Sequence, residues 1–212
     1  MAKAPRAGLA KTRLIPALGA EGAAQLARAF LVDSTAAARS AATTYVIASP
    51  DAACDDLAAL TGLAALPQGE GDLGARIVAG FDALFARGHA PVLLIGADTP
   101  TLPRGHIAAA LALLAEAPDR AVFGPTEDGG YWLVGLSAPA PALFAGIAWS
   151  TPRVLDETLA AAARAGIAVA LAPPWHDIDE PDDLAVLARQ LDADSATAPA
   201  TRDTLAALSP PR

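Results

Sequence analysis

The sequence predicts an α/β domain with a mostly parallel sheet that is covered by helices on both faces. Apolar strand-like runs alternate with Ala-rich helical runs along most of the chain, which is the order that builds such sheets. The run at residues 91–97 is apolar throughout its strand portion, as expected for a strand covered on both faces. At 212 residues, 53% of them hydrophobic, the chain is long enough for one large domain.

The expected elements follow from this alternation. Strands are predicted at residues 43–49, 91–97, 121–124, 130–136 and 167–172, and helices at 21–39, 52–60, 72–87, 104–117, 152–165 and 181–191. The runs 121–124 and 130–136 resemble a hairpin and would make the sheet mixed. From about residue 192 onward the chain lacks periodicity, so we expect one domain over 1–191 and a loose tail over 192–212 with at most one short helix.

Composition excludes several classes of protein. The formal net charge of -8 argues against general nucleic-acid binding, because a phosphate backbone needs a basic face. One cysteine and three histidines exclude an internal disulfide and a Cys/His zinc site. No apolar run reaches the roughly 20 residues that span a bilayer, and the opening residues lack a signal-peptide pattern. We therefore expect a cytoplasmic protein with no membrane partner, whose Ala-rich helices fit a core and a homo-oligomer interface equally well.

The opening stretch MAKAPRAGLAKTRL is unusually basic for an acidic chain. It has the proline and glycine of a loop, and it holds Lys3, Arg6, Lys11 and Arg13. Taken alone, a basic terminal run is usually only a solvated end. The alternative is a loop that neutralises phosphate groups.

Carboxylates follow the predicted strands, at the edge where open α/β sheets bind ligands. Asp98 comes directly after the run 91–97 and could hold Mg²⁺ or Mn²⁺, or could simply cap a turn. Asp177 and Asp179 are two residues apart on a probable extended segment, so both face one side. Asp128 precedes two glycines, which fit either a tight hairpin or a close approach to a ligand.

A glycine-rich turn, LPQGEGDLGARI, leads into the predicted helix 72–87. It matches neither a Walker loop nor a strict GxGxxG pattern, and such turns are often merely loops. The amide of Gln68 could read the edge of a base, because it both donates and accepts hydrogen bonds.

These motifs together resemble a known family. The segments KAPRAGLAKTRL, QGEGDLGARI, IGADTPTLP, GPTEDGGYWLVGL, WSTPRVLDET and DIDEPDDL occur in the order found in the bacterial DUF2064 group, which is described as glycosyltransferase-like and linked to arsenosugar biosynthesis. The resemblance extends to about residue 191. It implies a GT-A-type (Rossmann-like) nucleotide-diphospho-sugar transferase fold, with three α/β/α layers and a mixed, mostly parallel sheet. The 2-phospholactate guanylyltransferases are wider relatives with a similar opening.

The resemblance also implies roles for individual residues. Phosphate contacts are expected from Lys3, Lys11 and Arg13. Gln68 and the turn containing Gly71, Asp72 and Gly74 are expected near the base. Asp98 corresponds to the metal-binding acid and Asp177 or Asp179 to a second acidic position, whereas Asp128 with Gly129 and Gly130 corresponds to a segment near the acceptor. Asp98, Asp128 and Lys11 are thus the expected catalytic residues.

The implied function is a transferase that depends on Mg²⁺ or Mn²⁺ and uses a nucleotide-linked donor and a small-molecule acceptor. Glycosyl transfer would release a nucleoside diphosphate, whereas nucleotidyl transfer would release pyrophosphate. A third alternative is a non-catalytic nucleotide-binding protein.

The sequence departs from the family at its start. Relatives have a hydrophobic first strand running into the KAP segment, where this sequence has only Met1 and Ala2. We therefore expect a truncated first strand that leaves its neighbours with unpaired backbone groups. A start upstream of Met1 is the interpretation we favour over a damaged form, because the fold would then be complete.

Overall fold

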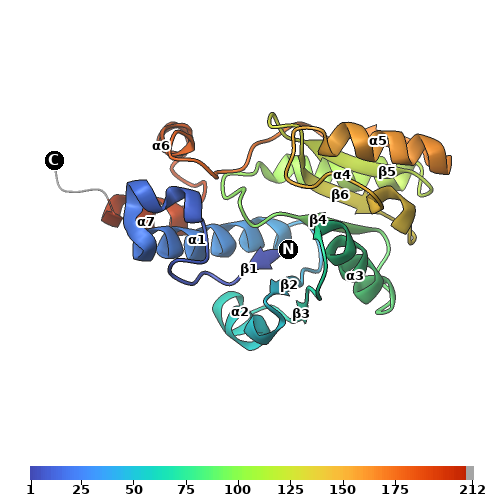
Figure 1. The fold of residues 1–212 in the computed structure, drawn as a ribbon. Coiled ribbons are helices and arrows are strands. Elements are labelled where there is room, and N and C mark those ends of the chain that lie inside the picture. The colour runs from blue at the N-terminus through green and yellow to red at the C-terminus, as the bar shows by residue number, and fades with distance from the viewer. Residues whose placement is uncertain (209–212) are drawn as a thin grey trace.

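The structure, a computed structural model, describes residues 1–208 and contains two sheets (Figure 1). The first is parallel, in the order β1 (Ala2–Lys3), β2 (Val46–Ser49), β3 (Ala65–Pro67). The second has the order β4-β6-β5-β7, with bounds β4 (Val92–Ile95), β5 (Ala121–Pro125), β6 (Tyr131–Leu136) and β7 (Val169–Leu171). Strand β6 is antiparallel to β4 and β5, and β7 is parallel to β5. The expected mixed, mostly parallel character is confirmed.

Six of the seven helices within residues 1–208 occur where the periodicity predicted them, and the seventh lies in the expected tail. They are α1 (Ile15–Arg39), α2 (Cys54–Thr61), α3 (Leu73–Phe85), α4 (Arg104–Glu116), α5 (Val154–Ala165), α6 (Asp183–Ala193) and α7 (Pro199–Leu208), with 3₁₀ turns η1 (Thr12–Leu14), η2 (Asp51–Ala53) and η3 (Pro141–Phe144). Helix α1 begins earlier than expected, but Gly19 interrupts it with φ 71°. None of the helices within residues 1–208 is long and apolar enough to cross a membrane.

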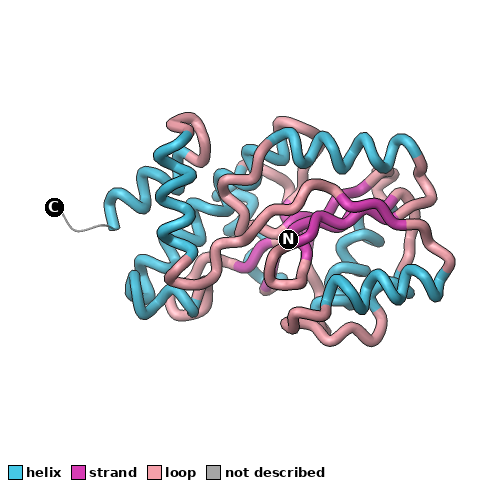
Figure 2. Tube along the Cα trace, turned by 90° about the horizontal axis from the view of Figure 1, so that it is seen from above, coloured by secondary structure: helices cyan, strands magenta, loops and turns pink. Residues whose placement is uncertain are grey.

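Helices cover both faces of the strands, which confirms the expected three layers (Figures 1 and 2). Alternate strand residues point to opposite faces. Ile47, Leu94 and Phe123 pack with residues of α3 and η3 on one face. On the other face, Val122 and Leu133 pack against α4, while α1 and α2 cover the first sheet.

The two sheets meet at β1, which is too short to join them as a strand. Its residues pair with β2 at Ala2↔Ala48 and Lys3↔Ser49. On the side of β4, the amine of Met1 donates a hydrogen bond to the carbonyl oxygen of Ile95 at 2.6 Å. Strand β1 thus has only two residues in this structure, as expected from the sequence. Whether the chain starts upstream of Met1 stays a prediction.

The expected loose tail is folded over most of its length. Helix α7 lies along α1 (Figure 1), where the carboxylate of Asp33 accepts hydrogen bonds from the backbone N–H groups of Ala200 and Thr201 at 3.2 and 2.7 Å. Leu208 packs beside Gly22 of α1. The tail was expected to be loose because local sequence does not show the partner of α7, which lies more than 160 residues earlier in the chain. Residues 209–212 lie outside the described part.

Candidate functional site

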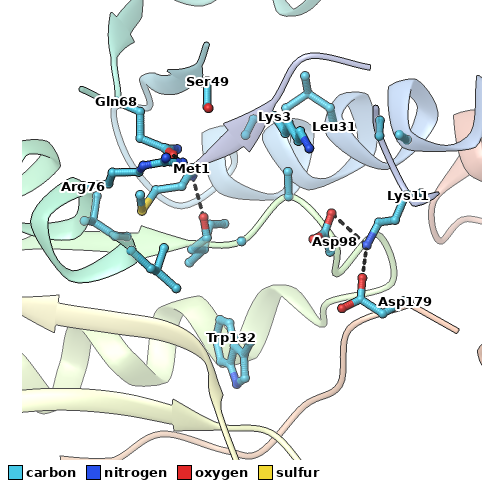
Figure 3. Close-up of a pocket in the computed structure, with 18 of the residues that line it drawn as sticks. Met1, Lys3, Lys11, Leu31, Ser49, Gln68, Arg76, Asp98, Trp132 and Asp179 are labelled. Carbon is cyan, nitrogen blue, oxygen red and sulfur yellow. Dashed lines mark hydrogen bonds and ion pairs between the residues drawn. The ribbon is translucent and has the colours of Figure 1, made fainter. Parts of the chain in front are cut away.

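A pocket of about 530 Å³ opens at the carboxyl ends of β1, β2 and β4 (Figure 3). This is the edge at which ligands bind in open α/β sheets. Six of the residues singled out from the sequence line it: Lys3, Lys11, Arg13, Gln68, Asp98 and Asp179. The structure therefore brings the basic loop, the strand-end carboxylate and the late acidic segment into one place.

At one end of this pocket an ammonium group is held between two carboxylates. The Nζ atom of Lys11 lies 3.1 Å from Oδ1 of Asp98 and 2.5 Å from Oδ1 of Asp179 (Figure 3). The side chain of Lys11 is 6% exposed, and its backbone is left-handed, with φ 46° and ψ 47°. A left-handed non-glycine residue is strained unless its surroundings hold it, and such strain is common at functional sites.

Backbone contacts set the distance between the two carboxylates. The N–H of Ile178 donates to the carbonyl oxygen of Asp98 at 3.0 Å, which ties the late acidic segment to the end of β4. The carboxylate of Asp183 accepts the N–H groups of Asp179 and Glu180 at 2.8 and 2.7 Å. This turn aims Asp179 at Lys11, so the pairing selects Asp179 rather than Asp177 as the partner of the basic loop.

Negative charge is concentrated here beyond what Lys11 neutralises. Burial alone would lower the pKa of Lys11, but the charges of Asp98 and Asp179 outweigh it and raise that pKa. The pKa of Asp177 is raised to about 6, first by burial and then by the neighbouring charges of Asp179, Asp128 and Asp98. A further cation near these carboxylates would relieve their repulsion.

The donor set fits a hard divalent cation only as a partial site. Asp98 and Asp179 direct one carboxylate oxygen each at a common point, and carboxylate oxygens are the ligands that Mg²⁺ prefers. Among residues 1–208, no three His, Cys, Asp or Glu side chains are grouped closely enough to hold a metal. Mg²⁺ usually takes one or two carboxylates plus substrate phosphates and water, so two carboxylates are a sufficient protein contribution.

Asp128 stands at the turn between β5 and β6, outside the lining of the pocket. Its Oδ1 atom accepts hydrogen bonds from the hydroxyl of Thr126 at 2.5 Å and from the N–H of Gly130 at 3.1 Å. Gly129 has φ 85° and lies against Pro152 in the loop before α5. Gly129 thus forms a tight turn and allows the backbone of Pro152 to approach closely, and the expected place of this segment near an acceptor stays a prediction.

Gln68 is buried, and its amide already has partners within the chain. Its Nε2 atom donates to the carbonyl oxygen of Ile47 at 3.4 Å, and its Oε1 atom accepts from Nη1 of Arg76 at 3.5 Å. Arg76 also donates from Nε to the carbonyl oxygen of Gly71 at 3.0 Å and lines the pocket. Arg76 was missed from the sequence, although its place in the first turn of α3, directly after the glycine-rich turn, was a usable signal.

Gly71, Asp72 and Gly74 of the glycine-rich turn shape the start of α3 and do not line the pocket. The carboxylate of Asp72 caps the helix by accepting the N–H of Ala75 at 2.8 Å. Gly71 has φ 100°, and a Cβ at Gly74 would lie 2.6 Å from the carbonyl oxygen of Phe144. These residue types are therefore required locally, and their expected place near a base stays a prediction.

Two further polar residues are explained by the structure. His176 bonds through Nε2 to the side-chain amide of Gln190, which also accepts from the hydroxyl of Thr101 at 2.8 Å. Arg13 forms an exposed ion pair with Glu180 at 3.0 Å. Lys3 lines the pocket without an ion pair to any residue of the described chain, so its charge is available to a ligand.

Comparison with known proteins agrees with this fold. The model of the family described as "Uncharacterized protein conserved in bacteria (DUF2064)" matches residues 31–151. The crystal structure of a Desulfovibrio desulfuricans G20 protein, inferred to be a nucleotide-diphospho-sugar transferase, is 32% identical, with a TM-score of 0.86. It covers 97% of this chain, which in turn covers 93% of that protein.

A more distant structure shares the fold. The crystal structure of a 4-diphosphocytidyl-2C-methyl-D-erythritol synthase is 16% identical with a TM-score of 0.57, over 77% of this chain and 88% of that one. A search of curated proteins gave no significant match.

Proposed function

The chain belongs to the DUF2064 family, and on that premise we propose that it is a transferase that binds the diphosphate of a nucleotide-linked donor beside Lys11 and transfers a glycosyl group from the donor to a small acceptor. The observation that carries the proposal is the convergence of Lys11, Asp98 and Asp179 in a pocket that Lys3 and Arg13 also line. The inferred activity of the Desulfovibrio relative supports a transferase of nucleotide-linked sugars.

In this proposal the pocket has two ends with different tasks. Lys3 and Lys11 neutralise the diphosphate as negative charge develops on it, in a site that is partly shielded from water. Ser49, Gln68 and Arg76 lie at the other end, where they would contact the nucleoside. The volume of about 530 Å³ is within the range of small-ligand sites.

The reaction requires one bond to form and one to break. The oxygen of an acceptor hydroxyl bonds to the anomeric carbon of the sugar, the bond from that carbon to the diphosphate oxygen breaks, and the hydroxyl proton passes to a base. We assign the base to Asp128, whose Oδ1 is fixed by Thr126 and Gly130 and whose Oδ2 would take the proton. A bound Mg²⁺ or Mn²⁺ would supply further charge neutralisation on the diphosphate, and Asp98 and Asp179 would hold it.

The product identifies the reaction. Each nucleotide sugar and each nucleoside triphosphate of a panel is incubated with the protein, Mn²⁺ and candidate acceptors, and released phosphates are separated by chromatography. Release of a nucleoside diphosphate is the expected result. Release of pyrophosphate from a nucleoside triphosphate would instead indicate nucleotidyl transfer. Binding of donors with no product from any of them would contradict catalysis and leave a nucleotide-binding protein.

A further inference from the structure

The ammonium of Lys11 lies where a cation bound by Asp98 and Asp179 would lie. Both carboxylates direct their Oδ1 atoms at it, at 3.1 and 2.5 Å. The Lys11 side chain is almost fully buried, and its Nζ also lies 5.7 Å from the centre of the Phe30 ring. The side chains of Asp98 and Asp179 are 49% and 40% exposed, so water screens these ion pairs in part, whereas the ammonium itself is shielded.

A divalent cation and this ammonium cannot be held by the same two oxygen atoms at once. Mg²⁺ binds oxygen at about 2.1 Å, so an ion between the two Oδ1 atoms would come into contact with Nζ. Two positive charges at such a distance in a partly buried site repel strongly. If the divalent cation takes these two Oδ1 atoms, Lys11 must therefore move away from them.

Lys11 has the means to move. Its charge sits on a flexible four-carbon stem that can change rotamer, whereas the carboxylates are anchored through the backbone of Asp98 and Ile178 and the turn at Asp183. A diphosphate in the same pocket would give the displaced ammonium a new anionic partner beside Lys3.

We propose that Lys11 and the divalent cation compete for Asp98 and Asp179, so that entry of the cation releases Lys11 toward the donor diphosphate. This inference rests on the proposed function and adds a coupling between its two ligands. Because such coupling is reciprocal, the donor diphosphate would also strengthen cation binding by drawing Lys11 away from the carboxylates. Lys11 thus links cation binding to donor binding.

The first test measures Mn²⁺ binding without any nucleotide, by the loss of the free Mn²⁺ signal in electron paramagnetic resonance. Wild type is compared with Lys11→Met and with Lys11→Gln, whose amide retains hydrogen-bond donors if the methionine variant fails to fold. Mn²⁺ affinity is reduced by the fraction of protein molecules in which Lys11 does not occupy the carboxylates. If this fraction is a tenth or less in wild type, both variants bind Mn²⁺ at least about tenfold more tightly.

Lys3→Met is the matched control. Lys3 lines the same pocket and carries the same charge, but it forms no ion pair with Asp98 or Asp179 in the described chain. Removing its charge alters only the general field of the pocket, so Mn²⁺ affinity is expected to change by no more than about twofold. A gain in this control as large as that in the Lys11 variants would overturn the competition.

A second measurement uses the wild-type protein. Acetic anhydride labels accessible amines, and mass spectrometry gives the labelled fraction of each lysine. Mg²⁺ is expected to increase labelling of Lys11 severalfold and to leave that of Lys3 unchanged. Labelling of Lys11 that is unchanged at saturating Mg²⁺ would overturn the inference even if no Lys11 variant folds.

The outcomes separate this inference from the proposed function. If the folded Lys11 variants bind Mn²⁺ as tightly as wild type or more weakly, the competition is overturned. The proposed donor binding and glycosyl transfer are not affected by that result. Absence of Mn²⁺ binding in wild type and in every variant overturns the inference and removes the metal from the proposed function. Calorimetric titration of the nucleotide donor into metal-free protein then reports whether the pocket binds a donor at all.

Discussion

A Cβ atom placed on Gly129 would lie 2.1 Å from the carbonyl oxygen of Pro152, which shows how tightly the β5–β6 turn packs against the loop before α5. The N–H of Leu155 donates to the carbonyl oxygen of Gly129 at 2.9 Å and holds the two segments together. This contact fixes the turn that carries Asp128.

We expect Gly129→Ala to lower the free energy of unfolding by about 3 kcal/mol, because it combines left-handed strain with overpacking against backbone. Gly146 is the matched control, since its φ is 72° and no atom lies within 4 Å of a Cβ built on it. Gly146→Ala should cost only the strain, about 1 kcal/mol. Urea denaturation measures both, and equal losses would show that the Pro152 contact is not limiting.

Asp98→Asn should remove the dependence of donor binding on Mn²⁺. Loss of a residue that only orients a metal ligand lowers metal affinity about 10- to 100-fold. We therefore expect loss of the ligand itself to lower Mn²⁺ affinity about tenfold or more. Asp182→Asn is the control, because Asp182 lies nearby at the start of α6 but is exposed and makes no capping bond. Calorimetry measures the donor affinity of each variant with and without Mn²⁺. If Mn²⁺ still strengthens donor binding in Asp98→Asn, the proposed placement of the metal is contradicted.

Arg76→Ala should weaken donor binding about tenfold through loss of a charged hydrogen-bond donor in the pocket and release of Gln68. Arg76→Lys should recover only part of this loss, because lysine lacks the planar fork that contacts Gly71 and Gln68 together. Arg164→Ala on the exposed side of α5 serves as the control. Unchanged donor affinity in Arg76→Ala would remove this residue from the site.

Metal-free stability should depend on the ionisation of Asp177. Its pKa is about 6 in the folded protein and near 3.8 when unperturbed, so the folded state holds this proton more strongly than the unfolded state. The half-buried Asp177 therefore lowers stability as the pH rises from about 4 to above 6, by about 1–2 kcal/mol after allowance for solvent screening.

Asp177→Asn removes that loss. In the presence of a chelator, urea denaturation should give the variant a gain over wild type near pH 8 and little or no gain near pH 4. A gain of the same size at both pH values would show that the effect does not come from ionisation of this carboxyl group.

Asp33→Ala should detach the C-terminal helix. The buried carboxylate accepts the N–H groups of Ala200 and Thr201, and loss of such a cap costs about 1–2 kcal/mol. Asp82→Ala on exposed α3 surface should change stability by less than about 0.5 kcal/mol. Hydrogen exchange localises the effect, and protection of residues 199–208 that equals wild type would contradict the docking role of Asp33.

The strands and helices were predictable where local pattern decides them. The apolar run ending before Asp98 and the amphipathic helices α3 and α5 follow from periodicity alone. Strand β3 was missed because its three residues, Ala65–Pro67, show too little alternation and include a proline. The tail was expected to hold at most one short helix, and the docking of α7 on α1 was missed because it depends on Asp33, a contact that no local window contains.

The candidate site was also predictable only in part from local sequence. Residue type and position at the end of a strand were sufficient to single out Asp98 and Lys11. The choice between Asp177 and Asp179 required the turn at Asp183, because two residues on one side of an extended segment are equivalent by spacing. Arg76 was not predictable as a partner of Gln68, since their bond depends on how α3 packs against β3.

The ion pair between Lys11 and Asp179 joins positions that are 168 residues apart. During synthesis from the N-terminus, the basic loop leaves the ribosome long before the segment that completes the site. Closing so long a loop carries a high entropic cost, which only a nearly complete fold can offset. A nascent chain that stops before Asp179 would therefore present Lys11 without one of its two carboxylates, and the site is completed only late in the synthesis of the chain.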